Sequence, residues 1–288
     1  MKKKEVNSSK PKNSKKRKRI NLIVYLTLRG LVIISLIAQA FRGNWNNVFL
    51  CILTLILFTL PTFLSKKLNI TLPTTLEIVV YLFIFSSEIL GEIQNFYGLF
   101  THWDTMLHTL NGFICAAVGF SLIDILNNNE NFHINMTPSF VALVAFCFSM
   151  TIGILWEFAE YTIDQYLEKD MQKDRIVTKI SSVKINENGD NEPIVIDNIN
   201  ETVIYSNNSN NTTIIEGGYL ELGIHDTMKD LFVNFMGALI FSSIGYLYIK
   251  NREGYRLVEI FIPKLKNHGD DLNEEEKGKK EKRKAYSH

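Results

Sequence analysis

Acidic residues and one histidine lie inside segments of this sequence that are otherwise apolar enough to cross a membrane. A charged side chain at the centre of a bilayer costs at least ~2.5 kcal/mol on insertion scales, so such residues usually serve a function. Together they predict a buried polar site, most simply a cation site. Eight of them are predicted metal ligands: Glu92, Asp104, His108, Glu157, Glu160, Asp164, Asp226 and Asp230.

The spacing of these residues places each group on one face of a helix. Asp104 and His108 are four residues apart, which is about one helical turn. Pairs of acids in three other apolar segments, at positions 88/92, 157/160 and 226/230, repeat a spacing of three or four residues. Because successive segments are predicted to cross in opposite directions, all the groups lie towards the outer face of the membrane, where we expect them to converge.

Carboxylates held close together repel one another unless protons or a cation neutralise them. One histidine among many carboxylates suits a divalent ion such as Zn²⁺, Mn²⁺ or Mg²⁺, so a divalent metal ion is the expected cofactor. Glu157 and Glu160 are the predicted catalytic residues, because a carboxylate near a metal-activated water can act as its general base. The Glu-x-x-His signature of dinuclear helical-bundle sites is missing, so the number of ions stays open.

Structural roles are the alternative for several of these residues. Asp104 and Asp226 open apolar segments, where an aspartate often caps the helix N-terminus. Asp164 falls at a predicted membrane boundary and could lie in water. Lys229 could neutralise an acid, which weakens the argument for a metal ion. His102 flanks its segment, and we expect it at the membrane interface.

Six apolar runs near 20 residues long must position these groups, since about that many residues are needed to cross ~30 Å of hydrocarbon. Of the 288 residues 46% are hydrophobic and 21% charged, but the charges gather in the tails and one long loop. The predicted fold class is all-α integral membrane, a six-helix transmembrane bundle over residues 20–250 with a small external β-rich insert. The spans are about 20–41, 48–64, 76–93, 104–126, 139–163 and 227–249.

The first span could instead be a cleaved signal peptide. It ends in Ala38-Gln39-Ala40, a pattern typical of signal-peptide cleavage sites. Its apolar residues extend on both sides of Arg29 and the basic segment before it is long, so an uncleaved helix is favoured. Either choice leaves the orientation of the later spans unchanged.

Lysine and arginine predict which ends of the spans face the cytoplasm. Residues 1–19 are expected to form a basic, disordered cytoplasmic tail, and residues 251–288 a charged cytoplasmic tail. Lys66 and Lys67 follow the second span on the same side, whereas the connector at 91–103 contains neither lysine nor arginine. The sequence therefore predicts a multi-pass protein of the bacterial cell membrane with both termini cytoplasmic.

The long loop between the fifth and sixth spans differs from the rest of the chain. Residues 177–185, 192–196 and 201–205 alternate apolar and polar side chains and are separated by asparagine-rich turns. This pattern predicts a small external β insert over residues 176–216. The insert could recognise a ligand, or it could be a solvated excursion of the chain.

Three motifs carry a resemblance to a known family. They are GEIQNFYGLFTHWDTMLHTLNGF (91–113), GILWEFAEYTIDQYL (153–167) followed by Met171-Gln172, and GIHDTMKDLFVNFMGAL (223–239). These motifs resemble the YjdF-like family of predicted bacterial inner-membrane proteins, over about residues 76–250 with the insert as an interruption. The resemblance implies the membrane topology and the polar site, and it names no reaction.

A fainter likeness is to VanZ-like membrane proteins, in which Asp-x-x-x-His and Asp-x-x-x-Asn-x-x-Gly helices occur. Asp104 and His108 match the first pattern, and residues 230–237 match the second. The glutamate pair of the fifth span departs from that family.

The leading functional hypothesis is a metal-dependent hydrolase or transferase that acts on a lipid or envelope precursor. One alternative is a divalent-cation or proton-coupled transporter, and another is a non-catalytic envelope protein that binds a partner. The expected partners are the lipid bilayer and a lipid or envelope-precursor ligand. A net charge of +1 and a basic tail without aromatic residues argue against nucleic acid as a partner.

Overall fold

The computed structural model describes residues 11–67, 69–127, 136–206, 212–252, 254–255 and 260–265. Its contacts divide the chain into two compact units. Unit 1 comprises Met1–Met150 with Asn234–His288, and unit 2 comprises Thr151–Val233. The boundaries fall inside two helices, α7 (Pro138–Leu167) and α8 (Ile224–Lys250), so each of these helices contributes residues to both units.

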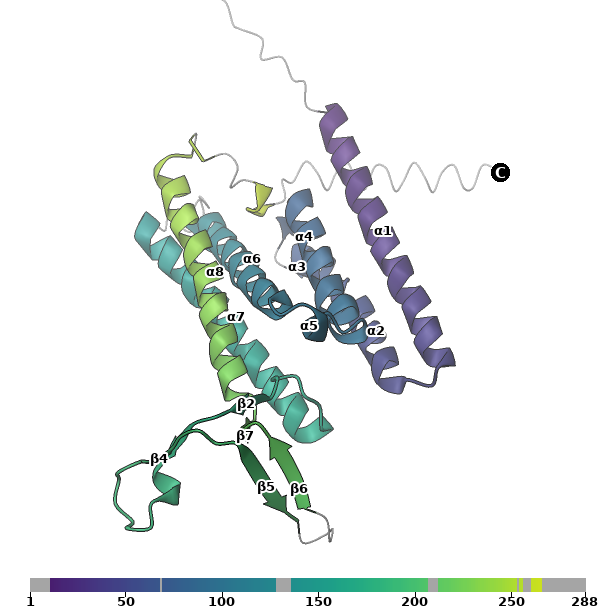
Figure 1. Cartoon of the computed structure of the whole chain (residues 1–288). Coiled ribbons are helices and arrows are strands. Elements are labelled where there is room, and N and C mark those ends of the chain that lie inside the picture. The colour runs from purple at the N-terminus through teal and green to yellow at the C-terminus, as the bar shows by residue number, and fades with distance from the viewer. Residues whose placement is uncertain are drawn as a thin grey trace, which may run out of the picture. The chain divides into compact units, whose positions relative to one another are not determined.

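The described part of unit 1 is mostly helical (Figure 1). Besides its parts of α7 and α8, it contains α1 (Pro11–Phe41), α2 (Trp45–Leu57), α3 (Leu60–Lys67), α4 (Thr74–Phe85), the π-helix η1 (Ser86–Ile93), α5 (Phe96–Leu99) and α6 (Trp103–Asn127). Among all described residues, five helical segments are long and apolar enough to cross a membrane: Arg19–Phe41, Trp45–Lys67, Trp103–Asp124, Pro138–Tyr166 and Ile224–Lys250. The predicted helical class with several spans is confirmed, but the count of six is not.

The predicted third span, at about 76–93, explains the difference in count. This segment consists of α4, with 12 residues, followed directly by η1, with 8 residues. The residues that join the two helices keep right-handed helical angles, so the chain continues without a turn. Two glutamates in η1 lower its apolar character, and neither helix alone is long enough to span a bilayer.

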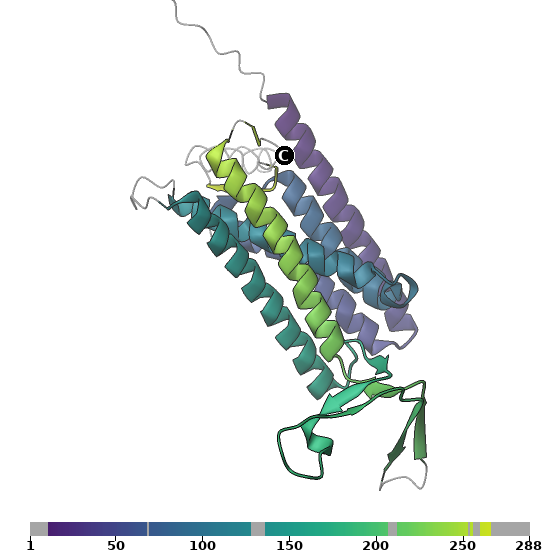
Figure 2. The same ribbon diagram turned by 60° about the vertical axis from the view of Figure 1, so that its left-hand side comes forward.

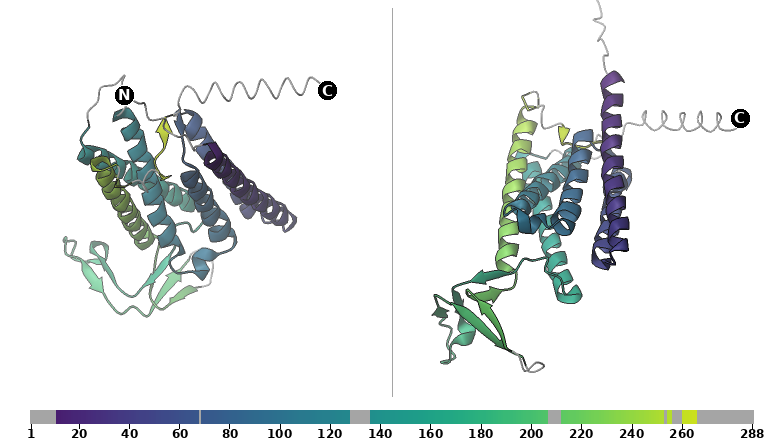
Figure 3. Two further views of the ribbon diagram at one scale, coloured as in Figure 1. Left: turned by 90° about the horizontal axis from the view of Figure 1, so that it is seen from above. Right: turned by 45° about the vertical axis from the view of Figure 1, so that its right-hand side comes forward.

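Two apolar cores hold unit 1 together. One lies where α1 packs against α2 and α4 (Figure 3). It contains the ring contacts of Tyr25, Phe58 and Tyr81. The other gathers buried side chains of α6 and α8 and of the unit 1 part of α7. Its members are Ala116, Ala117, Phe120, Val141, Ala145, Ala238, Phe241, Tyr248 and Ile262.

A short sheet in unit 1 joins two segments that are far apart in the sequence. Strand β1 (Ile70–Thr71) pairs antiparallel with β8 (Lys264–Leu265). Ile262, just before β8, is 4% exposed, and the ring of Phe261 meets that of Phe113 at 5.5 Å. The side chains of Phe261 and Ile262 therefore pack into the helical core, whereas the sequence predicted that residues 251–288 form a charged tail. The apolar run at 260–263 is the signal in the sequence.

The structure also differs from the predicted disordered tail at residues 1–19. Residues 1–10 lie outside the described residues, but residues 11–19 continue α1 towards its N-terminus. Proline is favoured at the first position of a helix, and lysine and arginine are good helix formers, so the local sequence supports this extension.

Unit 2 contains the expected β-rich insert (Figure 2). Its strands form three antiparallel two-stranded pairs, in which β3 pairs with β4, β5 with β6, and β2 with β7. The strands are β2 (Arg175–Val177), β3 (Ile180–Ser182), β4 (Ile194–Ile196), β5 (Glu201–Tyr205), β6 (Thr212–Glu216) and β7 (Tyr219–Glu221), and a 3-10 turn, η2, spans Val183–Ile185. Neither β6 nor β7 was predicted, because the alternating segments recognised in the sequence end at residue 205.

Candidate functional site

The first turn of α6 brings Asp104 and His108 together in unit 1. The His108 Nε2 atom lies 3.3 Å from Asp104 Oδ1, and both side chains are partly buried. Their i, i+4 spacing alone produces this contact once the helix forms. Imidazole nitrogen and carboxylate oxygen on one helical face are donors that zinc and manganese accept.

The π-helix η1 contributes a second polar group to unit 1. Glu88 is 6% exposed, and its Oε1 atom accepts a hydrogen bond of 3.4 Å from Ser87 Oγ. The Ser87 hydroxyl also lies 3.3 Å from the hydroxyl of Tyr97. π-Helical turns are rare and occur often at functional sites, because they shift side chains out of their ordinary helical positions.

Tyr97 connects the two polar groups of unit 1. Its ring lies directly over Gly91, where any larger side chain would collide with it. Burial raises the pKa of the Tyr97 hydroxyl, the hydrogen bond with Ser87 opposes this, and the neighbouring carboxylates of Asp104, Glu92 and Glu88 raise the pKa further. Tyr97 is therefore a neutral hydroxyl beside three acids, and unit 1 gathers Glu92, Asp104 and His108 from the predicted ligand set.

A close crossing of α6 and α8 supports this end of unit 1. A side chain at Gly112 would collide with the backbone of Asn234, and one at Gly237 would collide with the backbone of Thr109. Glycine at both positions lets the two backbones touch, as small residues do between membrane helices. Ser149 on α7 adds a hydrogen bond of 2.7 Å from its hydroxyl to the carbonyl oxygen of Gly112.

Unit 2 holds the predicted catalytic glutamates on one face of α7. Glu157 and Glu160 are 4% and 8% exposed, respectively. The indole Nε1 of Trp156 donates a hydrogen bond of 2.8 Å to Glu160 Oε1, which fixes the orientation of that carboxylate. Buried carboxylates held by a hydrogen bond suit a general base, although they suit a structural role equally.

The first turn of α8 holds three charged side chains of unit 2. Lys229 Nζ lies 3.4 Å from an oxygen of Asp226 and 3.4 Å from an oxygen of Asp230. Asp230 is only 1% exposed, whereas Lys229 is exposed. Asp226 also accepts a hydrogen bond of 2.9 Å from the backbone N–H of Lys173. The suspected neutralising role of Lys229 is thus visible in the structure.

Asp164 has a clear structural contact in unit 2. Its two carboxylate oxygens accept hydrogen bonds from the backbone N–H groups of Met171, at 2.6 Å, and Gln172, at 2.8 Å. The Gln172 side chain then donates a hydrogen bond of 2.6 Å to the Thr227 hydroxyl on α8. These contacts explain why Met171-Gln172 forms part of the motif: the two residues tie the end of α7 to the start of α8.

The predicted site residues therefore fall into two sets, one in each unit. That both sets share one ion stays a prediction from the sequence. Sequence reasoning missed Tyr97, Ser87 and Trp156 as members of these sets. Tyr97 lies in the connector at 91–103, which the sequence distinguishes only by its lack of lysine and arginine, so the tyrosine carried no separate signal.

Comparison with known proteins decides the family. The family of predicted membrane proteins called DUF2238 matches residues 20–251, which is most of the chain. This chain belongs to the DUF2238 family. The resemblance to YjdF-like membrane proteins is consistent with it, so that prediction is confirmed. The residues matched by DUF2238 include every polar group described above and the insert.

One relative is a protein from Thermotoga maritima described as an uncharacterized protein. It is 28% identical over 107 residues, which make up 37% of this chain. The matched region spans 53% of the relative's own length, or about half of it. No solved structure matches this DUF2238 chain. The comparisons therefore establish a membrane protein family and leave its activity to be proposed.

Proposed function

We propose that this protein binds a divalent metal ion and uses it for hydrolysis or group transfer on a lipid or envelope precursor. The observation that carries the proposal is the pair of Asp104 and His108, 3.3 Å apart, beside Tyr97. Glu92 supplies another carboxylate near that tyrosine. One imidazole and two carboxylates are the donor types of catalytic zinc and manganese sites, and the Asp104–His108 pair supports two of these ligands.

A bound metal ion would polarise an ester or phosphoryl oxygen and make a coordinated water more acidic. Asp104, His108 and Glu92 would hold the ion, and the neutral Tyr97 hydroxyl would donate a hydrogen bond to an anionic oxygen of the substrate. Glu157 and Glu160 are proposed as the general bases, as the sequence predicted. Glu160 is the better candidate for a fixed base, because Trp156 orients it.

We also propose that α4 and η1 together make a sixth span. Their 20 consecutive residues would extend about 30 Å, which is enough to cross the hydrocarbon core. Contacts within unit 1 support an even number of spans. Asn21, near the start of α1, donates to Glu77 at the start of α4, and β8 near the C-terminus pairs with β1. Both contacts thus lie close to residues 70–77.

The basic residues then set the orientation of the protein. Lys66 and Lys67 lie just before β1, and the segment before the first span is rich in lysine and arginine. Positive residues favour the cytoplasm, so both termini are proposed to be cytoplasmic in a bacterial cell membrane. The polar group at the start of α6 would then face the outside.

The transporter alternative would need acids that serve as ion sites at the inner ends of the helices. Asp124 is 2.8 Å from Arg252, and Glu77 accepts a hydrogen bond from Asn21. Each of these acids thus has a structural contact, which favours the enzyme over the transporter. The partner-binding alternative rests on the insert, in which all three residues of β4 are exposed.

Metal analysis of the purified protein tests the proposed function. We expect the full chain to contain zinc, manganese or magnesium, and we expect chelation to lower its melting temperature reversibly. Asp104→Asn and His108→Ala should each reduce metal content. Asp197→Asn, in an exposed ion pair with Lys179 in the insert, is the matched control and should keep the metal. A wild-type protein without bound metal, whose melting temperature ignores chelator and added metal, would refute the proposal.

A further inference from the structure

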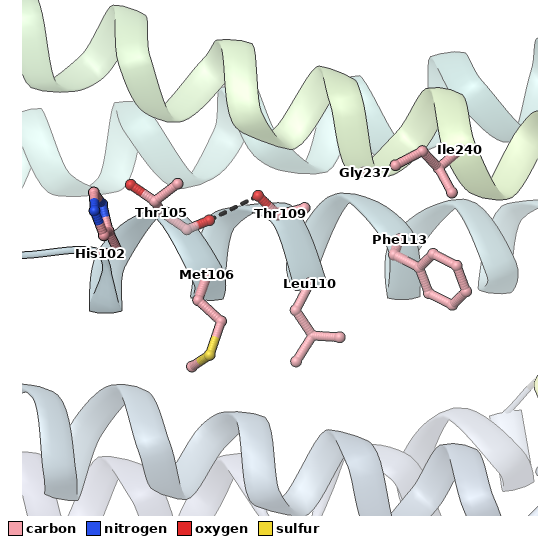
Figure 4. A pocket seen from close by; sticks show the side chains of 8 residues that line it. All are labelled: His102, Thr105, Met106, Thr109, Leu110, Phe113, Gly237 and Ile240. Carbon is pink, nitrogen blue, oxygen red and sulfur yellow. Dashed lines mark hydrogen bonds between the residues drawn. The ribbon is translucent and has the colours of Figure 1, made fainter.

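An apolar groove of about 400 Å³ lies along α6 and α8 in unit 1 (Figure 4). Its lining is almost wholly apolar. The two threonines in it offer little to a polar ligand, since Thr109 Oγ1 already donates a 2.7 Å hydrogen bond to the carbonyl oxygen of Thr105. The lining residues are His102, Thr105, Met106, Thr109, Leu110, Phe113, Gly237 and Ile240.

The length of the groove matches half of a bilayer. From His102 to Phe113 the chain advances eleven residues, almost all of them in α6. At 1.5 Å per residue this is about 16 Å, close to the ~15 Å of hydrocarbon in one leaflet. In the proposed topology the groove would extend from the outer end of α6 to about the depth where the two leaflets meet.

The two ends of the groove differ in chemistry. His102 is exposed at one end, next to Trp103, and both side chains are typical of the membrane interface. At the other end the ring of Phe113 packs against Phe241 at 4.9 Å and against Phe261 at 5.5 Å. This aromatic cluster closes the deep end, so the groove accepts a chain of limited length and not a continuous helix.

The floor of the groove is also closed. Gly237 brings the backbone of α8 against that of α6 at Thr109, which leaves no passage between the two helices. Met106 and Ile240 are 48% and 47% exposed, so the groove opens along its side. In a membrane that side faces lipid, and the occupant can enter from the bilayer.

We infer that this groove binds one acyl chain of a membrane phospholipid, with the lipid's polar headgroup at His102. The imidazole can donate a hydrogen bond to a phosphate or ester oxygen at that depth. The headgroup would lie in the first turn of α6, the turn that also carries Asp104. That the bound lipid is the substrate rests on the proposed function, whereas binding of the chain does not.

Photolabelling of the full-length protein in vesicles tests the inference. The probes are a phosphatidylglycerol and a polyprenyl phosphate, each with a photoreactive group near the end of a hydrocarbon chain. We expect labelling to concentrate on peptides that contain Leu110, Phe113 and Ile240. Because the groove accepts a chain of limited length, we expect the phosphatidylglycerol probe to label more strongly, and stronger labelling by the polyprenyl phosphate would overturn a phospholipid as the occupant.

Substitutions separate a specific groove from general contact with lipid. Ile240→Trp should fill the groove and lower labelling about tenfold, since a bulky side chain leaves no room for the chain. Ile240→Ala keeps the groove open and should retain labelling. Leu143→Trp is the matched control, because Leu143 is a 57% exposed leucine on α7 in the same unit.

Two further results would overturn the inference. One is even labelling of all lipid-facing helices, and the other is an equal loss of labelling in Ile240→Trp and Leu143→Trp. The metal proposal fails separately: if wild type and His108→Ala both lack metal but retain labelling at the groove, the groove stands and the metal site does not.

Discussion

Asn111 on α6 donates a hydrogen bond of 3.1 Å to the side-chain oxygen of Asn234 on α8. Asn234 is 1% exposed, and its own amide lies 3.7 Å from the sulfur of Met150 on α7. A buried amide in an apolar setting thus finds partners on two other helices, as buried polar groups generally must. This pair fixes the rotation of α6 relative to the unit 1 part of α8.

Asn234→Leu should destabilise the protein by about 0.6–1.7 kcal/mol, the range measured for hydrogen bonds between membrane helices. Unfolding in mixed detergent micelles measures the change. Asn111→Leu combined with Asn234→Leu should cost less than the sum of the single changes, because the two residues share one hydrogen bond. Strict additivity would show that the pair contributes no coupling energy.

Gly237→Ala should destabilise the protein by about 1–3 kcal/mol, because its Cβ would collide with the backbone of Thr109. Gly30→Ala is the matched control in α1, since a Cβ there meets no atom within 4 Å. We expect that control to be neutral or slightly stabilising through helix propensity. The same unfolding assay compares the two variants, and equal effects would contradict the close contact of α6 and α8.

Tyr97 should make the protein sensitive to alkaline conditions. Its pKa is raised in the folded state, so its contribution to stability is complete below the ordinary tyrosine pKa of about 10 and is lost as the pH rises towards the folded value. Tyr97→Phe should therefore flatten the fall in melting temperature above that pH. Tyr205→Phe, an 80% exposed tyrosine of the insert, should leave the fall unchanged.

Replacement of residues 180–214 by a short Gly/Ser linker should leave membrane insertion and helix content intact. The deletion removes the β3–β4 pair and most of the β5–β6 pair. In each pair the two strands hydrogen-bond to each other and not to a helix. The β2–β7 pair at the base of the insert remains. Circular dichroism and size-exclusion chromatography measure the result, and loss of the folded protein would show that the insert is required for the helices to form.

Reporter fusions after Asn127 and Asn207 should report opposite sides of the membrane. Asn127 ends α6 and is expected in the cytoplasm, whereas Asn207 lies in the insert and is expected outside. A fusion after Lys67 should agree with the one after Asn127. If the fusions after Asn127 and Asn207 reported the same side of the membrane, the six-span topology would be wrong.

The long apolar runs allowed several ends of the main helices to be predicted to within a few residues. The fourth predicted span, 104–126, is α6 at Trp103–Asn127, because length and apolar character alone determine such a helix. The π-helical turn at Ser86 was not predictable, since it depends on a hydrogen-bond pattern that leaves no periodicity in the sequence. This turn is also why the count of spans differs.

The candidate site was predictable only in part. Spacing was enough to predict the contact of Asp104 with His108, because both lie on one helix. The backbone contacts of Asp164 could not be foreseen, since they depend on how the chain folds back after α7. Residues 260–265 were missed for a similar reason: the short apolar run at 260–263, in a charged tail, has no partner until the helices are in place.

The pairing of β1 with β8 sets an order on the biogenesis of this protein. Ile70 is synthesised before α4 and its partner Leu265 after α8, so the pair cannot form until every described helix between them has been made. Before that moment Phe261 and Ile262 have no core to enter. Formation of the strand pair is thus a late step in the assembly of these helices. A chain truncated before Ile260 would lack Phe261 and would leave the deep end of the apolar groove without its aromatic cover.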